Sequence, residues 1–329
     1  MDRRLTSLGE KVLGGSDITG AEASFICGLQ GDDVYDLFYW ANKIRHKFLG
    51  DEVSCCSLVS AKQGKCSEDC SFCAQSARFD TAVEEFPLIG EDALKDALGN
   101  TSKAGAGSLG IVTSGRELSD EEVERLCAGV SRINGANGAK NGVHVHGSLG
   151  LLSAKTARRL KESGVRRINH NLETSENFFP RLCTSHSYGD RVRTIRLARE
   201  AGLEVCSGGI FGVGEMPEDR VDLAFTLKEL DVDTVPLNFL NPIPGTPLAD
   251  VEPLNPIEIL RIIALFRFIM PAKEIKVAGG REKNLGDMQS WIFYAGANSI
   301  IVGGYLTTKG RPPEEDLRMI SDLGLRVKR

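Results

Sequence analysis

The stretch VSCCSLVSAKQGKCSEDCSFCAQS, residues 53–76, joins a β-strand pattern to a short loop with three cysteines. Residues 53–61 carry the β-branched pattern of a strand. Cys66, Cys70 and Cys73 follow with the spacing C-x3-C-x2-C. A closed structural zinc site needs a fourth ligand and usually paired C-x2-C motifs, so a zinc loop is the weaker interpretation, together with unliganded thiols. A [4Fe–4S] cluster held by three thiolates leaves one iron open for a cofactor, which favours that centre.

The alternation of strand and helix patterns continues along the chain after this loop. Helical patterns occupy residues 119–133, 153–164, 189–202 and 255–270, with Ser119 as an N-cap and Gly164 and Gly202 as C-terminal caps. The eight units predict a (β/α)8 barrel, with a doubly wound open sheet as the alternative. The three cysteines then lie at the mouth, where barrels carry their working residues. The expected strands are residues 53–61, 107–114, 142–148, 165–172, 203–210, 232–240, 274–280 and 297–304.

Other sequence patterns indicate the domain organisation, the kinds of partner and the cellular location of the protein. Residues 1–50 predict a helical extension with an amphipathic helix at 32–50, and residues 51–329 predict one barrel domain without a linker. The net charge of −5 argues against a nucleic-acid partner. No run of about 18 apolar residues predicts a membrane span, and the N-terminus lacks the apolar region of a secretory signal. We therefore expect a cytoplasmic protein.

The cysteine count indicates thiols rather than disulfides. The chain has nine cysteines, an odd number, in a large protein without a secretory signal. Cys27 and Cys127 fall in apolar helical patterns and are expected in the core.

The cysteine loop after the first strand, with Phe72 before its third cysteine, resembles the signature of the radical S-adenosylmethionine enzymes. Six blocks, in order from about residue 50 to 325, are similar to the biotin synthase family: SAKQGKCSEDCSFCAQS, RRINHNLETS, EVCSGGIFGVGE, VPLNFLNPIPGTPL, AGGRE and AGANSIIVGGYLTT. The resemblance implies that Cys66, Cys70 and Cys73 hold a [4Fe–4S] cluster whose open iron binds S-adenosylmethionine. A 5′-deoxyadenosyl radical would then remove hydrogens from dethiobiotin, and sulfur would enter at two carbons to form biotin.

The resemblance also implies binding residues. Arg191 matches an arginine that meets the methionine carboxylate, for which a guanidinium is well suited, although an exposed helix arginine is the alternative. Asn171 and Glu173 match residues that touch substrate and the cofactor ribose. Asn238 matches a ligand of the ureido ring, to which a carboxamide offers both donor and acceptor. For both asparagines, hydrogen bonding within a turn or the barrel core is the alternative.

The block GGIFGVGE, residues 208–215, matches the strand end that binds the cofactor in this family. Gly208 and Gly209 are expected to let the backbone approach the adenine closely, and Glu215 is expected at the same site. A phosphate-binding glycine loop is the weaker interpretation, because the spacing differs.

The chain departs from the family at the second, auxiliary cluster. That cluster is usually [2Fe–2S], is held by three cysteines and one arginine inside the barrel, and donates the sulfur. Cys206 matches one cysteine and Arg281 matches the arginine. Gly110 and His146 stand where the other two cysteines are expected.

The thiol pair in the first strand suggests a different ligand set. Cys56 occupies a position where the family usually has a serine that faces the barrel interior, and alternation would turn Cys55 outward unless a bulge intervenes. We hypothesise an auxiliary iron–sulfur cluster on Cys56 and Cys206, with its type open. Cys55, Cys183 or His146 would complete it, and Arg281 would lie beside it. The alternative is that this cluster is lost and the paired cysteines are core residues.

Three functions remain open from the sequence. The first is biotin formation, with a flavodoxin or ferredoxin as electron donor and a homodimer as the expected state of the family. The second is a related radical enzyme with another substrate, such as a mutase or a cofactor-maturation enzyme. The third is a non-enzymatic iron–sulfur carrier or sensor, for which a complete cofactor-binding set is excessive.

Overall fold

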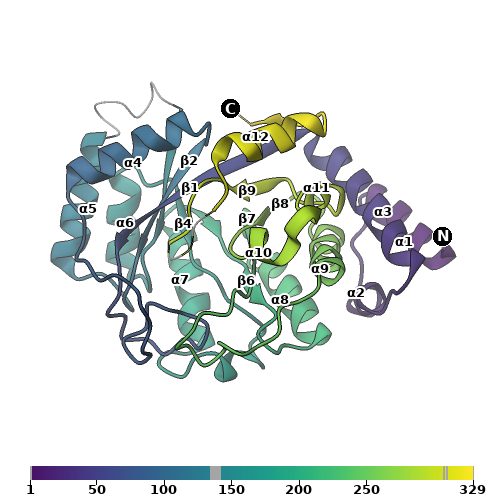
Figure 1. Ribbon diagram of the computed structural model, residues 1–329, viewed down its shortest axis with the longest axis horizontal. Coiled ribbons are helices and arrows are strands. Elements are labelled where there is room, and N and C mark those ends of the chain that lie inside the picture. Colours follow the sequence, from purple (N-terminus) through teal and green to yellow (C-terminus); the bar gives the residue numbers. More distant parts are fainter. Residues whose placement is uncertain (1, 134–141, 307, 309, 329) are drawn as a thin grey trace.

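A closed, all-parallel barrel forms the centre of the computed structural model, which describes residues 2–133, 142–306, 308 and 310–328 (Figure 1). The strand order β1-β2-β3-β4-β5-β7-β8-β9 returns to β1 through the pairing of β1 with β9. This closure confirms the (β/α)8 barrel and excludes the open sheet. The barrel strands are β1 (Glu52–Lys62), β2 (Ser108–Thr113), β3 (His144–Ser148), β4 (Arg167–Asn169), β5 (Glu204–Cys206), β7 (Thr234–Phe239), β8 (Glu274–Val277) and β9 (Ser299–Ile301).

The strand expected at 203–210 is interrupted, which corrects the prediction of one continuous strand. β5 pairs with β7 at Cys206 and Thr234, and a separate strand β6 (Gly209–Phe211) pairs further along β7. A Cβ atom on Gly208 would lie 1.9 Å from the carbonyl oxygen of Pro236. The chain therefore crosses β7 too closely at Gly208 for any side chain, and the ladder breaks there.

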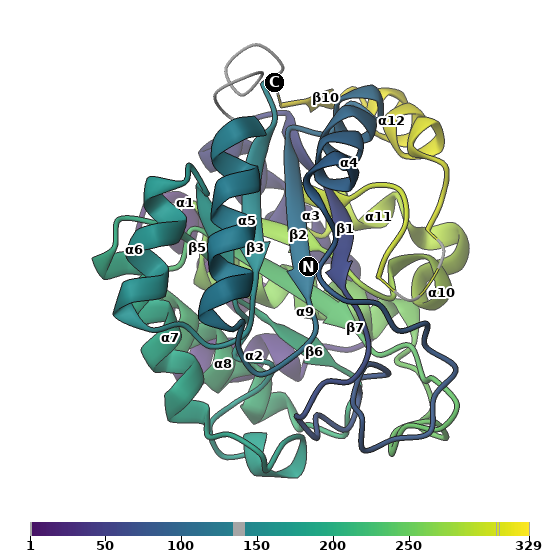
Figure 2. The same cartoon turned by 90° about the vertical axis from the view of Figure 1, so that its left-hand side faces the viewer.

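Helices cover the outside of the barrel. Ser119 caps the helix that follows β2, because its hydroxyl accepts from the Glu122 amide and its own amide donates to the Glu122 carboxylate. Figure 2 shows α5 and α6 side by side over β3. The covering helices are α4 (Glu91–Lys103), α5 (Asp120–Ile133), α6 (Ala154–Glu162), α7 (Tyr188–Glu200), α8 (Pro217–Glu229), α9 (Pro256–Ile269), α10 (Arg281–Leu285), α11 (Trp291–Tyr294) and α12 (Pro313–Asp322).

The N-terminal segment is helical, as predicted. It forms α1 (Arg3–Leu13), α2 (Gly20–Cys27) and α3 (Asp32–Leu49), which lie together at one side of the barrel (Figure 1). α3 packs on α9 and α11, and α2 packs on α8 and α9. The apolar face of α3 is buried in the main core through Leu37, Phe38 and Ile44. Burial of this face attaches the helices to the barrel.

The two ends of the barrel differ in their role. The long loop after β1, with the three cysteines, lies at the C-terminal end, at the lower right of Figure 2. The short strand β10 (Arg326–Val327) pairs with the start of β1 at the opposite end. Within the described part of the chain, no helix is long and apolar enough to cross a membrane.

Gly208→Ala is expected to lower the free energy of unfolding of the cluster-free protein by about 3 kcal/mol, the upper end of the usual cost of overpacking, because the new methyl group overlaps the Pro236 carbonyl. Urea titration followed by circular dichroism measures this change. Gly99→Ala in α4 is the matched control, since no atom lies within 4 Å of its new Cβ. The control should gain about 0.5–1 kcal/mol from helix propensity. Equal stabilities for the two variants would contradict the close crossing at Gly208.

Candidate active site

The three predicted cluster ligands surround one cavity. Cys66, Cys70 and Cys73 all line a space of about 230 Å³ at the mouth of the barrel. The loop turns back on itself because the Cys66 amide donates to Gln75 O at 3.0 Å and the Ala77 amide donates to Cys66 O at 2.8 Å. Three thiols directed at one cavity fit a [4Fe–4S] cluster with one open iron.

Asp69 ties the cysteine loop to the loop that follows β4. Its Oδ1 accepts from the amides of Thr184 at 2.9 Å and Ser185 at 3.0 Å, and its Oδ2 accepts from the Thr184 hydroxyl. Burial alone would raise the pKa of Asp69, but these hydrogen bonds hold it below its ordinary value. The ionised carboxylate therefore sets the position of Cys70, its neighbour in the chain.

Asp69→Ala is expected to destabilise the cluster-free protein by about 1.5–3 kcal/mol at neutral pH, because the amides lose a charged acceptor. Chemical denaturation measures this loss, and iron counts after desalting should show weaker retention of the first cluster. Asp80→Ala, an exposed position in the same loop, is the control and should match the native protein. Native-like stability of Asp69→Ala would show that Asp69 does not anchor the loop.

Arg191 lies beside the cysteine loop, and a hydrogen bond to His186 fixes its side chain. A capping box between Ser187 and Asp190 starts α7, so Arg191 projects from its first turn. Its Nε donates to His186 Nε2 at 2.9 Å, and His186 Nδ1 donates to Glu68 Oε2 at 2.5 Å. Because an arginine Nε can only donate, His186 Nε2 is the acceptor in this arrangement and the ring proton is assigned to Nδ1. Burial lowers the pKa of His186, but its contacts with Cys183 and Glu68 raise it above the ordinary value. A guanidinium Nη2 lies 4.0 Å from Cys70 Sγ, within the same cavity.

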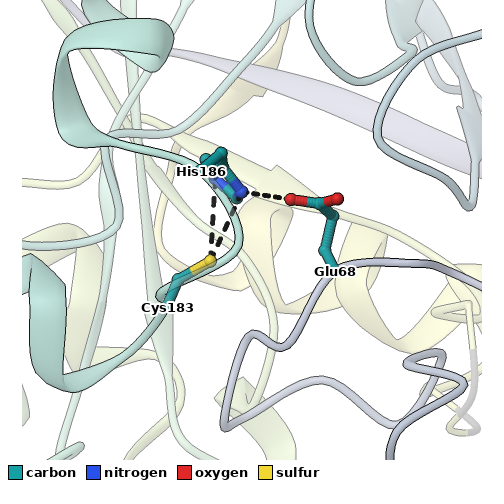
Figure 3. A group of neighbouring side chains, drawn as sticks. All are labelled: Glu68, Cys183 and His186. Atoms are coloured by element: carbon teal, nitrogen blue, oxygen red, sulfur yellow. Dashed lines mark hydrogen bonds and ion pairs between the residues drawn. The ribbon is translucent and has the colours of Figure 1, made fainter.

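Glu68, Cys183 and His186 form a compact group (Figure 3), and His186 is the member that contacts Arg191. Their ligand atoms lie within 4.8 Å of one another, as in a metal site. His186 already uses both ring nitrogens, however, and Cys183 Sγ lies 3.7 Å from Cys70 Sγ. The group therefore supports Arg191 and the cysteine loop, and it is a set of residues that the sequence did not reveal as a unit.

A second cavity of about 270 Å³ adjoins the first. Phe72, Cys73, Asn171 and Glu173 line both cavities and so form the wall between them. Burial raises the pKa of Glu173 above its ordinary value, and Arg191 Nη1 at 3.5 Å opposes this effect. Glu173 has φ of +73°, a left-handed conformation that turns the chain after Asn171 into the mouth.

The predicted substrate residues lie at the second cavity. Asn238 lines it, but its Nδ2 donates to Gly209 O at 3.1 Å and its Oδ1 accepts from the Gly279 amide at 2.9 Å. Asn171 Oδ1 accepts from the Gly208 amide at 3.3 Å. Each carboxamide therefore has a fixed orientation and still keeps one amide hydrogen and one lone pair for a ligand.

Glu215 is not one of the described residues that line the two mouth cavities. Its carboxylate accepts from the amides of Gly212 and Val213 and from Arg220 Nε at 2.9 Å. This differs from the predicted cofactor contact, because the side chain closes the turn between β6 and α8. Packing within the protein also requires a glycine at position 209, since a Cβ there would lie 2.4 Å from Glu173 O.

Three buried polar groups aimed at the first cavity were not predicted. Thr113 Oγ1, Asn169 Oδ1 and His170 Nε2 have no hydrogen-bond partner among the described residues, and all three residues line that cavity. Buried polar atoms without partners are rare in folded proteins and indicate that a polar ligand completes the site. The position of His170 between the two asparagines of NHN was the available sequence signal.

The barrel interior below the mouth is polar, unlike the apolar filling of most barrels. Cys56, Cys206 and His146 are each at most 3% exposed. Burial raises the pKa of Cys206, and the charges that act on its thiol come from Lys276, Arg167, Glu274 and Cys56. The same two thiols act on the Lys276 ammonium. Cys56 and Lys276 line one cavity inside the barrel, and the Cys206 thiol lies within electrostatic range of both.

His146 faces the same interior. Its Nδ1 is buried and has no partner among the described residues, and burial lowers its pKa well below the ordinary value. A neutral imidazole with a free nitrogen is the form that binds metals. Together with the two thiols, it fits an iron–sulfur centre with mixed ligands.

Arg281, predicted beside this centre, is engaged elsewhere. Its guanidinium donates to Asp316 at 2.7 and 2.9 Å, to Gln289 at 2.9 Å and to the carbonyl of Ile301 at 3.3 Å. The residue follows the end of β8 and points between α10 and α12, so the structure does not bring it to Cys206. Lys276, on β8 itself, is the basic residue that the structure brings there.

Of the other two thiols considered for the auxiliary centre, Cys183 lies at the mouth, whereas Cys55 lines the same cavity as Cys56, His146 and Lys276. Burial raises the pKa of the Cys55 thiol, and the charges that act on it come from Asp316, Cys56, Arg281 and Lys276, so this thiol lies between the α12 side of β1 and the centre. Cys183 belongs to the group at the mouth. The register shift in β1 lies between Ser60 and Lys62, so no bulge turns Cys55 inward.

Comparisons with known proteins agree with this geometry. Residues 62–227 match the model of the Radical SAM superfamily, and residues 236–326 match the Biotin and Thiamin Synthesis associated domain. The chain is 49% identical over 328 residues to a biotin synthase of Geotalea daltonii, covering 99% of this chain and 98% of the relative. It is 47% identical to a biotin synthase of Geobacter sulfurreducens, covering 98% and 97%.

Solved structures share the fold. Methylornithine synthase (PylB) superposes with a TM-score of 0.85 at 22% identity, covering 98% of this chain and 97% of that chain. HydG, a maturase of the [FeFe]-hydrogenase, superposes with a TM-score of 0.83 at 15% identity, covering 99% and 75%. At these identities the likeness concerns the barrel alone.

Proposed function

Since this chain belongs to the biotin synthase family of radical S-adenosylmethionine enzymes, we infer that it converts dethiobiotin to biotin by radical insertion of sulfur. The observation that carries this inference is the pair of adjoining cavities, one lined by three thiols and Arg191 and the other by Asn171 and Asn238. The first cavity suits an iron–sulfur cluster together with the amino-acid part of S-adenosylmethionine. The second cavity suits a small cyclic urea.

The family uses a [4Fe–4S] cluster, S-adenosylmethionine and an auxiliary iron–sulfur cluster, which together supply the hydrogen-abstracting radical and the sulfur. We propose that Cys66, Cys70 and Cys73 hold the first cluster and that Arg191 binds the methionine carboxylate. Glu68 and His186 fix the guanidinium in place through their hydrogen bonds. Glu173 lies between the cavities, where its carboxylate is positioned to accept ribose hydroxyls while Asn171 and Asn238 hold the substrate. We expect Gly208 and Gly209 to let the backbone approach the adenine closely, and within the fold they let the chain pass close to Pro236 and Glu173.

We propose that Cys56, Cys206 and His146 hold the auxiliary cluster, with Lys276 beside it in place of Arg281. The unpartnered His146 nitrogen supports this assignment, as does the buried ammonium next to two thiols. A lysine ammonium has no acceptor or lone pair while protonated, so its role there is to offset the negative charge of thiolates and sulfides.

Other features of the protein stay predictions. We expect a flavodoxin or ferredoxin as electron donor, a homodimer, a cytoplasmic location and a single domain over residues 51–329. Size-exclusion chromatography with light scattering measures the dimer directly.

An anaerobic assay tests the proposed function. The reconstituted protein is incubated with dethiobiotin, S-adenosylmethionine and a low-potential reductant, and biotin and 5′-deoxyadenosine are quantified together. We expect biotin to accumulate with deoxyadenosine. Deoxyadenosine without biotin or a thiolated intermediate, from protein with full iron and sulfide, would instead indicate a radical enzyme with another substrate.

A further inference from the structure

A third cavity opens at the N-terminal end of the barrel, opposite the cysteine loop. It has a volume of about 180 Å³ and runs from exposed Arg166 and Lys328 to buried Cys56 and His146. Figure 2 shows this end at the top, where β10 lies beside the starts of the barrel strands. Cys56 and His146, two of the proposed ligands of the auxiliary cluster, therefore line a path to solvent that does not pass through the mouth.

The cavity is cationic. Arg166, Arg167, Lys276 and Lys328 line it, against one lining carboxylate, Glu274. Behind them, Glu204 binds both arginines at 2.7 Å. The Lys276 side chain is only 5% exposed, and its nearest acidic contact among the described residues is Glu274 at 3.8 Å. Cationic walls in a recessed, low-dielectric space raise the local concentration of small anions.

The mouth and this third cavity approach the barrel interior from opposite sides. Leu58 lines the second cavity and Cys56 lines the third, and the two residues lie on the same face of β1. Leu58 also fills the space beside Gly110, because a Cβ on Gly110 would lie 2.6 Å from its Cδ2. Substrate and cofactor at the mouth would leave the N-terminal opening as the free route to Cys56.

We propose that this cavity admits hydrosulfide, HS⁻, to replace the sulfide that the auxiliary cluster gives up. This proposal rests on the proposed function and on the assignment of that cluster to Cys56 and Cys206. The replacement needs no oxidant or reductant, since HS⁻ supplies S²⁻ to iron and its proton leaves to solvent. The cationic lining attracts the anion, and Lys276 receives it next to the two thiols.

Exchange of heavy sulfide tests the route without turnover. Protein with both clusters is incubated anaerobically with ³⁴S-sulfide, without cofactor or substrate, and the label in acid-labile sulfide is followed by mass spectrometry. Lys328→Glu, and Lys328→Glu combined with Arg166→Gln, should slow labelling of the auxiliary sulfide by about tenfold at low ionic strength. The difference should shrink as salt is added. Lys103→Glu, exposed at the end of α4 and outside the lining, is the matched control and should label at the native rate.

The Cys206→Ala variant tests the assignment of the auxiliary cluster separately from the proposed path of hydrosulfide. If the assignment is right, only the first cluster remains in this variant and can be labelled. If this variant keeps native iron and native labelling, the assignment of the auxiliary cluster is wrong. If it loses the auxiliary component while the Lys328 variants label at the native rate, the assignment stands and the route is overturned. The first cluster, open at the mouth, should label equally in every variant and serves as an internal reference.

Discussion

Cys206→Ala is expected to abolish biotin formation while S-adenosylmethionine is still cleaved. Cys206 is fully buried inside the barrel beside Cys56 and Lys276, remote from the loop that carries the first three cysteines. Loss of its thiolate removes a proposed ligand of the sulfur-donating cluster and leaves the first cluster complete. The variant should keep about four irons per chain, the content of one [4Fe–4S] cluster. Deoxyadenosine should still form in its assay, with biotin at background.

Cys56→Ala should give the same result, because its thiol faces the same interior. Cys127→Ala is the matched control, since this cysteine is buried in α5 and away from both centres. Iron, acid-labile sulfide, deoxyadenosine and biotin are measured on all three proteins. Native iron in both Cys206→Ala and Cys56→Ala would refute the auxiliary assignment.

Arg191→Leu is expected to produce the next largest effect, at the cofactor. Truncation of one partner of a buried, hydrogen-bonded charge pair costs about 2–5 kcal/mol, or roughly 30-fold to several thousandfold in affinity. The half-saturating concentration of S-adenosylmethionine should rise accordingly, with little change in that of dethiobiotin. The first cluster should remain, because Arg191 is not one of its ligands.

Two variants separate the charge of Arg191 from its positioning. Arg191→Lys keeps the charge but loses the fork that binds a carboxylate with two hydrogen bonds, so it should recover only part of the affinity. His186→Ala removes the support of Arg191 Nε and should raise the same concentration by a smaller factor. Arg193→Leu, exposed on the same helix, is the control. An unchanged cofactor requirement in Arg191→Leu would remove Arg191 from the cofactor site.

The barrel was predictable because its signals are local. Each β-branched run and each capped helix follows from side-chain periodicity and from residues such as Ser119 that bind their own backbone. The interruption at Gly208 was not predictable, because it depends on Pro236 in a different strand. A close crossing between two distant segments leaves no pattern in either of them.

The site was predictable where one segment carries it and less so where several strands meet. The three cysteines lie in one loop, and the structure directs all of them at one cavity. Lys276 and Arg281 are basic residues that lie close together in the sequence. The sequence predicted Arg281 beside Cys206, whereas Lys276 is the one that acts on the Cys206 thiol in the structure. The overlooked signal was the charge of Lys276 between Ile275 and Val277, since a lysine inside an apolar strand of a barrel needs a buried anionic partner.

The wall shared by the two mouth cavities makes their occupants thermodynamically dependent on each other. Phe72, Cys73, Asn171 and Glu173 contribute to both spaces, so a molecule in one cavity contacts side chains that a molecule in the other also contacts. Any coupling through this wall is reciprocal, so each molecule changes the affinity of the protein for the other by the same factor. We therefore expect the affinity for S-adenosylmethionine to depend on whether dethiobiotin is bound, and equilibrium binding with and without dethiobiotin measures this dependence.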